Sequence, residues 1–146
     1  MPRFFHALAE QALAVGPPLG WAGQFSYERN RDFPHTIDLK LQGARLFTDA
    51  ARLWALQMGI WTTGTAERLR AAGAIQQRAA EDIAAGVEAF HLVQRFRIEQ
   101  QLRTHDLDAV NRVDPNDLNE LHRLMLKEAF RQAGKLQLRL KKQFGL

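Results

Sequence analysis

Several kinds of chemistry are missing from this 146-residue sequence. It has no cysteine, which excludes disulfide bonds, a thiolate nucleophile and thiolate-bound metal. Its only serine, Ser26, lies outside the Gly-x-Ser-x-Gly setting of a serine hydrolase, and there is no glycine-rich phosphate loop. The apolar stretches, such as that around Leu46 to Trp54, fall short of the ~20 residues that span a bilayer. We therefore expect no catalytic centre, no membrane span and a cytoplasmic location.

Metal-binding patterns are also missing. No two of the five histidines have the His-x-x-x-His spacing that places two ligands on one helical face. Asp106 and Asp108 have the Asp-x-Asp spacing that holds two metal ions in nucleotidyl transfer. They follow an expected helix, however, and the chain lacks the Gly-Ser turn that precedes such a pair in a nucleotidyltransferase. We interpret them as a solvated loop, and we expect no metal site.

The charge balance points weakly to an acidic partner. The formal net charge is +4 and the sequence pI is about 10.0, which favours phosphates, nucleotides or nucleic acid as ligands. Most of the positive charge comes from arginine, and arginine on helical faces is more typical of a solvated or salt-bridged surface. Nucleic acid is therefore not the favoured partner.

The spacing of apolar residues predicts an all-α protein. Helices are expected over residues 2–15, 37–58, 65–72, 78–104 and 119–143, with Gly59 closing the second, Gly73 just beyond the third and Asn119 capping the last. Residues 19–36, with an extended Gln24 to Glu28, are expected to form an ordered loop or a brief edge strand. Three long and two short helices indicate an antiparallel helical bundle, in which residues 1–36 pack with residues 37–146 as one domain.

The last helix has a predicted core face of six apolar residues. They are Leu121, Leu124, Met125, Ala129, Leu136 and Leu140. Their spacing of three, four and seven residues places them on one side of a helix, which we expect to face the bundle.

A polar stripe along the predicted 37–58 helix carries the candidate site. Asp49 lies four residues after Arg45 and three before Arg52, so one carboxylate faces two guanidinium groups and a positive charge remains. If Arg97 and Gln101 of the 78–104 helix face the same side, the pocket offers several donors to a phosphate or carboxylate. An ion-pair network that fixes helix register explains the stripe equally well. In either case, Arg52→Ala is expected to cost stability by leaving Asp49 unpaired.

Motifs spread along the chain resemble a known family. They are Ile37-Asp38-Leu39-Lys40, Gly43, Asp49-Ala50-Ala51-Arg52-Leu53, Thr65-Ala66-Glu67-Arg68-Leu69, Arg97 with Gln101, Asn111, Asp114-Pro115 and Leu118. From about Phe4 to its end, the sequence looks like the putative nucleotidyltransferase substrate-binding domain. In that family, the domain follows a nucleotidyltransferase domain similar to the PII uridylyltransferases. CBS and often cyclic-nucleotide-binding domains precede both in bacterial signal-transduction proteins.

The resemblance implies a non-catalytic accessory domain that helps a nucleotidyltransferase domain of the same parent chain to hold its substrate. Nucleoside triphosphate and Mg are then expected only in that catalytic domain, and a PII-like protein or a small acceptor is the expected partner. The family pattern marks eight residues in this sequence, namely Asp38, Lys40, Asp49, Arg52, Arg68, Arg97, Gln101 and Asn111.

Two further expectations concern the ends and the assembly of the chain. The Pro17-Pro18-Leu19-Gly20 turn resembles the family's join to its catalytic domain, which would make the first helix the tail of that domain and Met1 an artificial start. The alternative function is a structural or dimerisation module that binds no ligand, in which the polar stripe only locks helix packing and the chain forms a homodimer.

Overall fold

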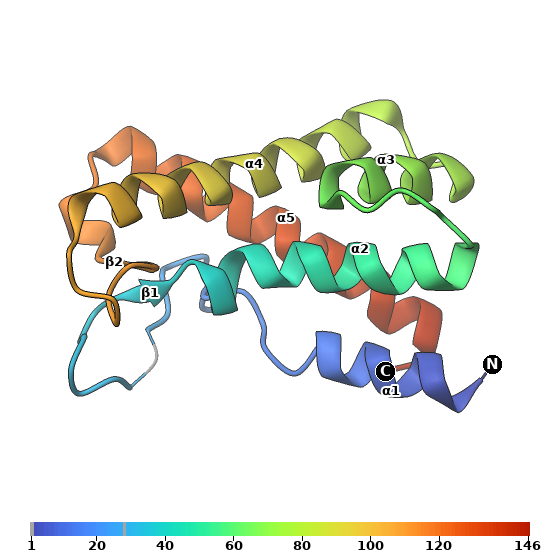
Figure 1. Cartoon of the computed structure of the whole chain (residues 1–146), viewed down its shortest axis with the longest axis horizontal. Helices are drawn as coiled ribbons and strands as arrows, with labels where there is room; N and C mark the ends of the chain where they lie inside the picture. The colour runs from blue at the N-terminus through green and yellow to red at the C-terminus, as the bar shows by residue number, and fades with distance from the viewer. Residues whose placement is uncertain (1, 28) are drawn as a thin grey trace.

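A computed structural model describes residues 2–27 and 29–146 and shows a helical protein with one small strand pair (Figure 1). In chain order the elements are α1 (Arg3–Ala12), β1 (Ile37–Asp38), the π-helical turn η1 (Lys40–Ala44), α2 (Arg45–Met58), α3 (Thr65–Ile75), α4 (Ala80–Arg103), β2 (Arg112–Val113), the 3₁₀ turn η2 (Pro115–Asp117) and α5 (Glu120–Phe144). The predicted all-α class is confirmed, with α2, α4 and α5 as the long helices and α1 and α3 as the short ones. The expectations for Met1 and for Glu28 lie outside the described residues.

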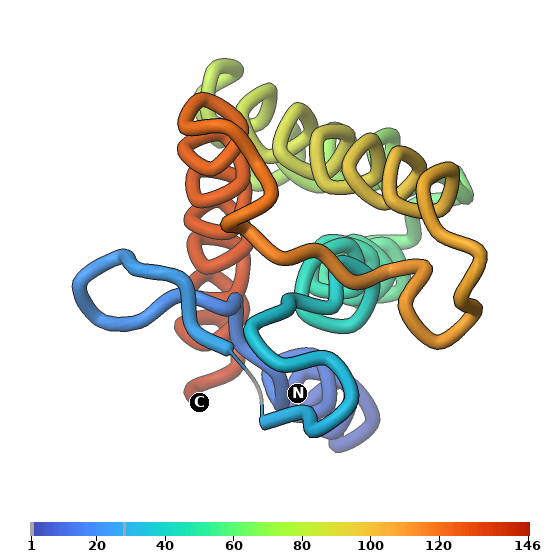
Figure 2. The backbone as a smooth tube through the Cα atoms, turned by 90° about the vertical axis from the view of Figure 1, so that its left-hand side faces the viewer, coloured from blue at the N-terminus to red at the C-terminus, as the bar shows by residue number. Residues whose placement is uncertain are grey.

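Helix α2 runs through the middle of the molecule. In both views α1 lies on one side of α2, α3 and α4 lie on the other, and α5 crosses the layer obliquely (Figures 1 and 2). The core is built around large side chains of α2 and α5 that are fully buried, namely Phe47, Trp54, Leu126, Phe130 and Leu140. Burial of this apolar surface is the main source of stability for the fold.

The predicted start of the second helix is wrong. Ile37 and Asp38 form β1, which pairs antiparallel with Val113 and Arg112 of β2. The Asp38 carboxylate accepts hydrogen bonds from the backbone N–H groups of Lys40 and Leu41, both at 2.9 Å. An aspartate that caps these N–H groups favours a helix that begins after it rather than through it. The predicted end is confirmed, since Gly59 terminates α2 in the left-handed conformation with φ 69°.

Two details of the other helices also differ from the prediction. Gly73 lies inside α3 rather than beyond it, because the helix continues to Ile75. On α5, Ala129, Leu136 and Leu140 are buried as expected, but Leu121 and Leu124 are 64% and 58% exposed. These two leucines border surface grooves that remain open between α4 and α5. The predicted Asn119 cap is confirmed by its 2.8 Å hydrogen bond from the His122 N–H.

Residues 19–25 of the loop that follows α1 pack against the core. A single bridge joins Leu19 to Phe25, and the Phe25 ring packs edge-on against Phe130 of α5 with 6.3 Å between ring centroids. The Lys127 ammonium lies 5.0 Å from the centroid of the same Phe25 ring. No helix in the described ranges is long and apolar enough to cross a membrane.

Candidate functional site

The residues of the predicted polar stripe line a groove between α1 and α2. Arg45, Asp49 and Arg52 occupy successive turns on the side of α2 that faces α1, and Gln11 of α1 faces them. The groove has a volume of about 340 Å³, and its remaining lining is apolar, formed by Leu8, Ala12, Ala14, Leu53 and Leu56. We call it the α1–α2 groove.

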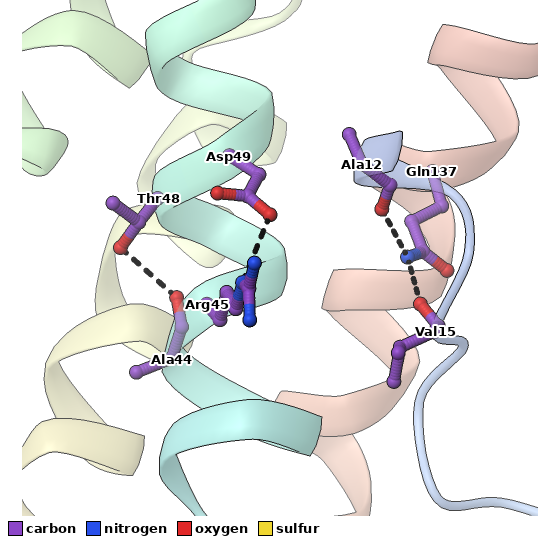
Figure 3. A network of polar contacts seen from close by, with 7 residues as sticks. All are labelled: Ala12, Val15, Ala44, Arg45, Thr48, Asp49 and Gln137. Carbon is purple, nitrogen blue, oxygen red and sulfur yellow. Dashed lines mark hydrogen bonds and ion pairs between the residues drawn. The ribbon is translucent and has the colours of Figure 1, made fainter. Parts of the chain in front are cut away.

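One ion pair lies within the α1–α2 groove. The Arg45 Nε is 3.5 Å from the Asp49 Oδ2 (Figure 3), with the Arg45 side chain 62% exposed and that of Asp49 22% exposed. Arg52 is exposed and forms no ion pair within 4.0 Å of any carboxylate that the structure describes. The expectation that Asp49 pairs with both arginines is therefore wrong. The Arg45 guanidinium has a carboxylate partner, and the Arg52 guanidinium has none among the described residues.

This geometry revises the expected effect of Arg52→Ala on stability. Because Arg52 is exposed and Asp49 keeps Arg45 as its partner, the substitution leaves no unpaired buried charge. We expect the free energy of unfolding to change by no more than about 0.5 kcal/mol. Urea denaturation followed by circular dichroism measures it, and a loss above about 1 kcal/mol would show that Arg52 does brace the helices.

A buried glutamine of α5 holds α1 in place as one wall of the groove. The Gln137 Nε2 donates hydrogen bonds to the carbonyl oxygens of Val15 at 2.7 Å and Ala12 at 3.4 Å (Figure 3). Ala9 and Ala12 bury their methyl groups against the core. The last carbonyl groups of a helix lack partners within the helix. Gln137 supplies such a partner to the end of α1.

Arg97 and Gln101 do not face the α1–α2 groove. The Arg97 Nε and the Gln101 Nε2 both donate to the Asn111 Oδ1, at 3.2 and 3.3 Å, and the Arg97 Nη1 donates to the Gln94 Oε1 at 2.7 Å. They belong to α4, which lies on the opposite side of α2 from α1 (Figure 2). The condition under which they would share one pocket with Arg45 and Arg52 is therefore not met, because α4 and α1 pack on different sides of α2.

The Arg97–Gln101–Asn111 cluster instead fixes a loop. The backbone carbonyl of Asn111 accepts a hydrogen bond of 2.8 Å from the Leu39 N–H, next to the β1–β2 pair. Its side chain is held by α4. Asn111 thus joins α4 to the start of η1, which accounts for these three polar residues by structure alone.

Of the other residues in the family pattern, Asp38 and Arg68 have local structural roles. Asp38 caps η1, and Arg68 donates from its Nε to the Thr62 carbonyl at 2.8 Å, which holds the loop before α3. Lys40 is exposed. Sequence reasoning missed Gln11, because only the packing of α1 on α2 brings it to the groove.

The α1–α2 groove has the chemistry of an anion site. Its charged lining is two guanidinium groups and one carboxylate, and the unmatched Arg52 presents donors that suit a phosphate or carboxylate. A divalent cation would need several oxygen ligands, and one carboxylate beside two arginines does not fit that need. Within residues 2–27 and 29–146, no three His, Cys, Asp or Glu side chains cluster as a metal site.

Comparison with known families gives a match to nearly the whole chain. The family model described as "Putative nucleotidyltransferase substrate binding domain" matches residues 2–144. The match includes α1 and α2, so both walls of the groove lie within it. Comparison with curated proteins and with solved structures finds no match.

Proposed function

The chain belongs to this nucleotidyltransferase substrate-binding family, and from that premise we propose that the α1–α2 groove holds an anionic group of a substrate for a catalytic domain of the same parent protein. The observation that carries the proposal is the unmatched charge of Arg52 beside the Arg45–Asp49 pair. A phosphate or carboxylate that enters the groove would meet two fork-shaped donors. The chain itself performs no chemistry and contributes binding and orientation.

Asp49 has a positioning role in this proposal. Its carboxylate restrains the Arg45 side chain along one turn of α2, which reduces the freedom that Arg45 would lose on binding a ligand. The same carboxylate repels an anion, so the groove is selective for ligands that reach Arg52. Nucleoside triphosphate and Mg belong to the catalytic domain in this scheme, where the transfer takes place.

The wider setting follows from the family resemblance. We place the parent protein in the bacterial cytoplasm, as a signal-transduction protein in which CBS domains regulate the nucleotidyltransferase domain. The acceptor is then a PII-like protein or a small molecule that carries the anionic group.

Calorimetric titration of nucleoside triphosphates and of PII-like proteins into the chain, alone and joined to its catalytic domain, tests the proposal. We expect Arg52→Ala and Arg45→Ala each to weaken binding of the acceptor by about tenfold, which equals about 1.4 kcal/mol. Arg52→Lys should lose part of the affinity, because lysine keeps the charge but not the fork.

Arg95→Ala is the matched control for these variants. Arg95 and Glu99 form an exposed i, i+4 ion pair of 3.7 Å on α4, outside the groove. Arg95→Ala changes the net charge by the same amount as Arg45→Ala or Arg52→Ala but leaves the proposed site intact. The affinity for the acceptor should therefore stay unchanged. Unaltered affinity in folded Arg45→Ala and Arg52→Ala variants would refute the ligand role.

A dimerisation module is the second candidate function, and one observation favours it. The groove between α4 and α5 that Leu124 borders has a volume of about 440 Å³ and a mainly apolar lining. Sedimentation equilibrium distinguishes the two functions. A dimer that Leu124→Glu converts to monomers would support the module, and a monomer at high concentration would exclude it.

A further inference from the structure

A second groove lies between the second half of α5 and the α3–α4 turn, and its lining is strongly basic. It has a volume of about 310 Å³ and is bordered by the α3–α4 turn, the first turn of α4 and the second half of α5. The charged side chains that line it are Arg78, Asp82, Lys135, Arg139 and Lys142. Four cations thus face one carboxylate. We call it the basic groove.

The backbone at Arg78 is held by the turn that ends α3. Arg78 follows Gln77, which adopts the left-handed conformation with φ 57°, and its N–H donates to the Gly73 carbonyl at 3.0 Å. The Gln77 N–H donates to the Ala74 carbonyl at 3.1 Å, which completes a Schellman ending of α3. A Cβ on Gly73 would lie 2.6 Å from the Ile83 Cγ1, so glycine permits the close approach of α3 and α4 at this turn.

The Arg78 guanidinium has unused hydrogen-bonding capacity. Its Nε is buried and has no hydrogen-bond partner among the residues described, and the same is true of the Oε1 of Gln76, two residues earlier in the chain. Burial and, second, the charge of Arg139 lower the pKa of Arg78, and Asp82 only partly offsets them. A buried donor without a partner is unfavourable, so a ligand that bonds to it binds more tightly.

Arg131, one turn before Lys135 on α5, differs from the cations of the basic groove because it has a carboxylate partner. Arg131 forms hydrogen bonds of 2.6 and 2.7 Å with the two Glu128 oxygens. The four cations of the basic groove have no ion pair within 4.0 Å in the part of the chain that the structure describes. Like charges gathered without carboxylates repel each other, and a bound anion relieves that repulsion.

We propose that the basic groove binds an oligophosphate, either as an inorganic ion or as the phosphate chain of a nucleotide. Arg78 and Arg139 suit one phosphate with forked donors, and Lys135 and Lys142 neutralise its neighbours. Arg139 and Lys142 also line an adjoining surface groove with Gln76 and Gln143. The basic surface therefore extends beyond the reach of a single phosphate. Its confinement to one end of α5 favours a small ligand over nucleic acid, which needs a longer basic track.

Titration with inorganic triphosphate, measured by calorimetry at constant ionic strength, tests the proposal. We expect the wild-type chain to bind triphosphate at least about tenfold more tightly than sulfate, because several charges act together. Arg78→Ala and Arg139→Ala should each weaken triphosphate binding by about tenfold or more. Arg139 is exposed, so its variant keeps the test valid if Arg78→Ala does not fold.

Two carboxylate variants form a matched pair. Asp82→Asn removes the only negative charge of the lining and should tighten triphosphate binding several-fold, whereas Glu81→Gln, on the neighbouring exposed residue outside the groove, should have little effect. Adenosine triphosphate in a parallel titration separates the sources, since tighter binding than triphosphate identifies a nucleotide. Equal binding identifies the phosphate chain alone.

The outcome is independent of the α1–α2 groove. Arg95→Ala, which removes an exposed cation outside both grooves, should leave triphosphate affinity unchanged, whereas Arg78→Ala and Arg139→Ala report on the basic groove alone. Absence of triphosphate binding at low salt, or binding that Arg78→Ala and Arg139→Ala leave intact, would overturn the proposal. It would also be overturned by a single-stranded oligonucleotide that binds more tightly than triphosphate and loses affinity in the same variants.

Discussion

Trp54→Ala is expected to lower the free energy of unfolding by about 3 to 5 kcal/mol. Trp54 lies in the second half of α2 and is only 1% exposed, so the substitution leaves a large cavity in the core. It also removes the indole N–H that donates to the Gln143 Oε1 at 2.9 Å and thereby ties α2 to the end of α5. Urea denaturation followed by circular dichroism measures the loss, which approaches the whole stability of many small domains.

Trp61→Ala is the matched control. Trp61 lies just beyond α2 and is 96% exposed, so the same change of side chain there should alter stability by no more than about 0.5 kcal/mol. Trp54→Phe should fall between the two, because it keeps an aromatic ring in the core but leaves Gln143 without its donor. Equal losses for Trp54→Ala and Trp61→Ala would contradict the assigned core.

The long helices could be predicted because their signals are local. Periodic apolar residues define α4 and α5, and the Asn119 side chain caps α5 as its position before the apolar run suggests. The β1–β2 pair could not be predicted in the same way. Each strand has two residues, which is too short for a periodic pattern, and the pairing joins Ile37 to Val113 across about half of the chain.

Part of the candidate site could be predicted from local sequence, and part could not. Helical geometry alone places Arg45, Asp49 and Arg52 on one face, and the structure keeps them together in one groove. Whether Arg97 joins them depends on which side of α2 receives α4, and that choice is made by the whole core. The basic groove gave no local signal either, because Arg78 comes from a turn and Arg139 from a helix sixty residues later.

Gln137→Met is expected to release α1 and to cost about 1 to 3 kcal/mol of stability. Methionine fills a similar volume but donates no hydrogen bond, so the buried Ala12 carbonyl and the partly buried Val15 carbonyl lose the partner that Gln137 gives them. Helix α1 has ten residues, too few to be stable in water without its contacts. Relative to the wild-type chain, amide hydrogen exchange should therefore speed up more in α1 than in α2.

Gln100→Met on α4 is the control for this substitution. Gln100 is partly exposed, and its side chain forms no hydrogen bond within the described ranges, so its replacement should leave both stability and exchange nearly unchanged. If Gln137→Met also leaves exchange in α1 unchanged, the burial of Ala9 and Ala12 alone holds the helix.

Gln137→Met also tests the proposed function, because it acts on one wall of the α1–α2 groove. Arg45 and Arg52 keep their place on α2 when α1 loosens, but the opposite wall of the groove, with Gln11 and Ala12, does not. An anion held only by the two arginines would bind to Gln137→Met as it does to the wild-type chain. An anion enclosed by both walls would bind more weakly, because water then screens the guanidinium groups more strongly. We expect the second result, with a loss of affinity comparable to that of Arg52→Ala, measured by the same calorimetric titration.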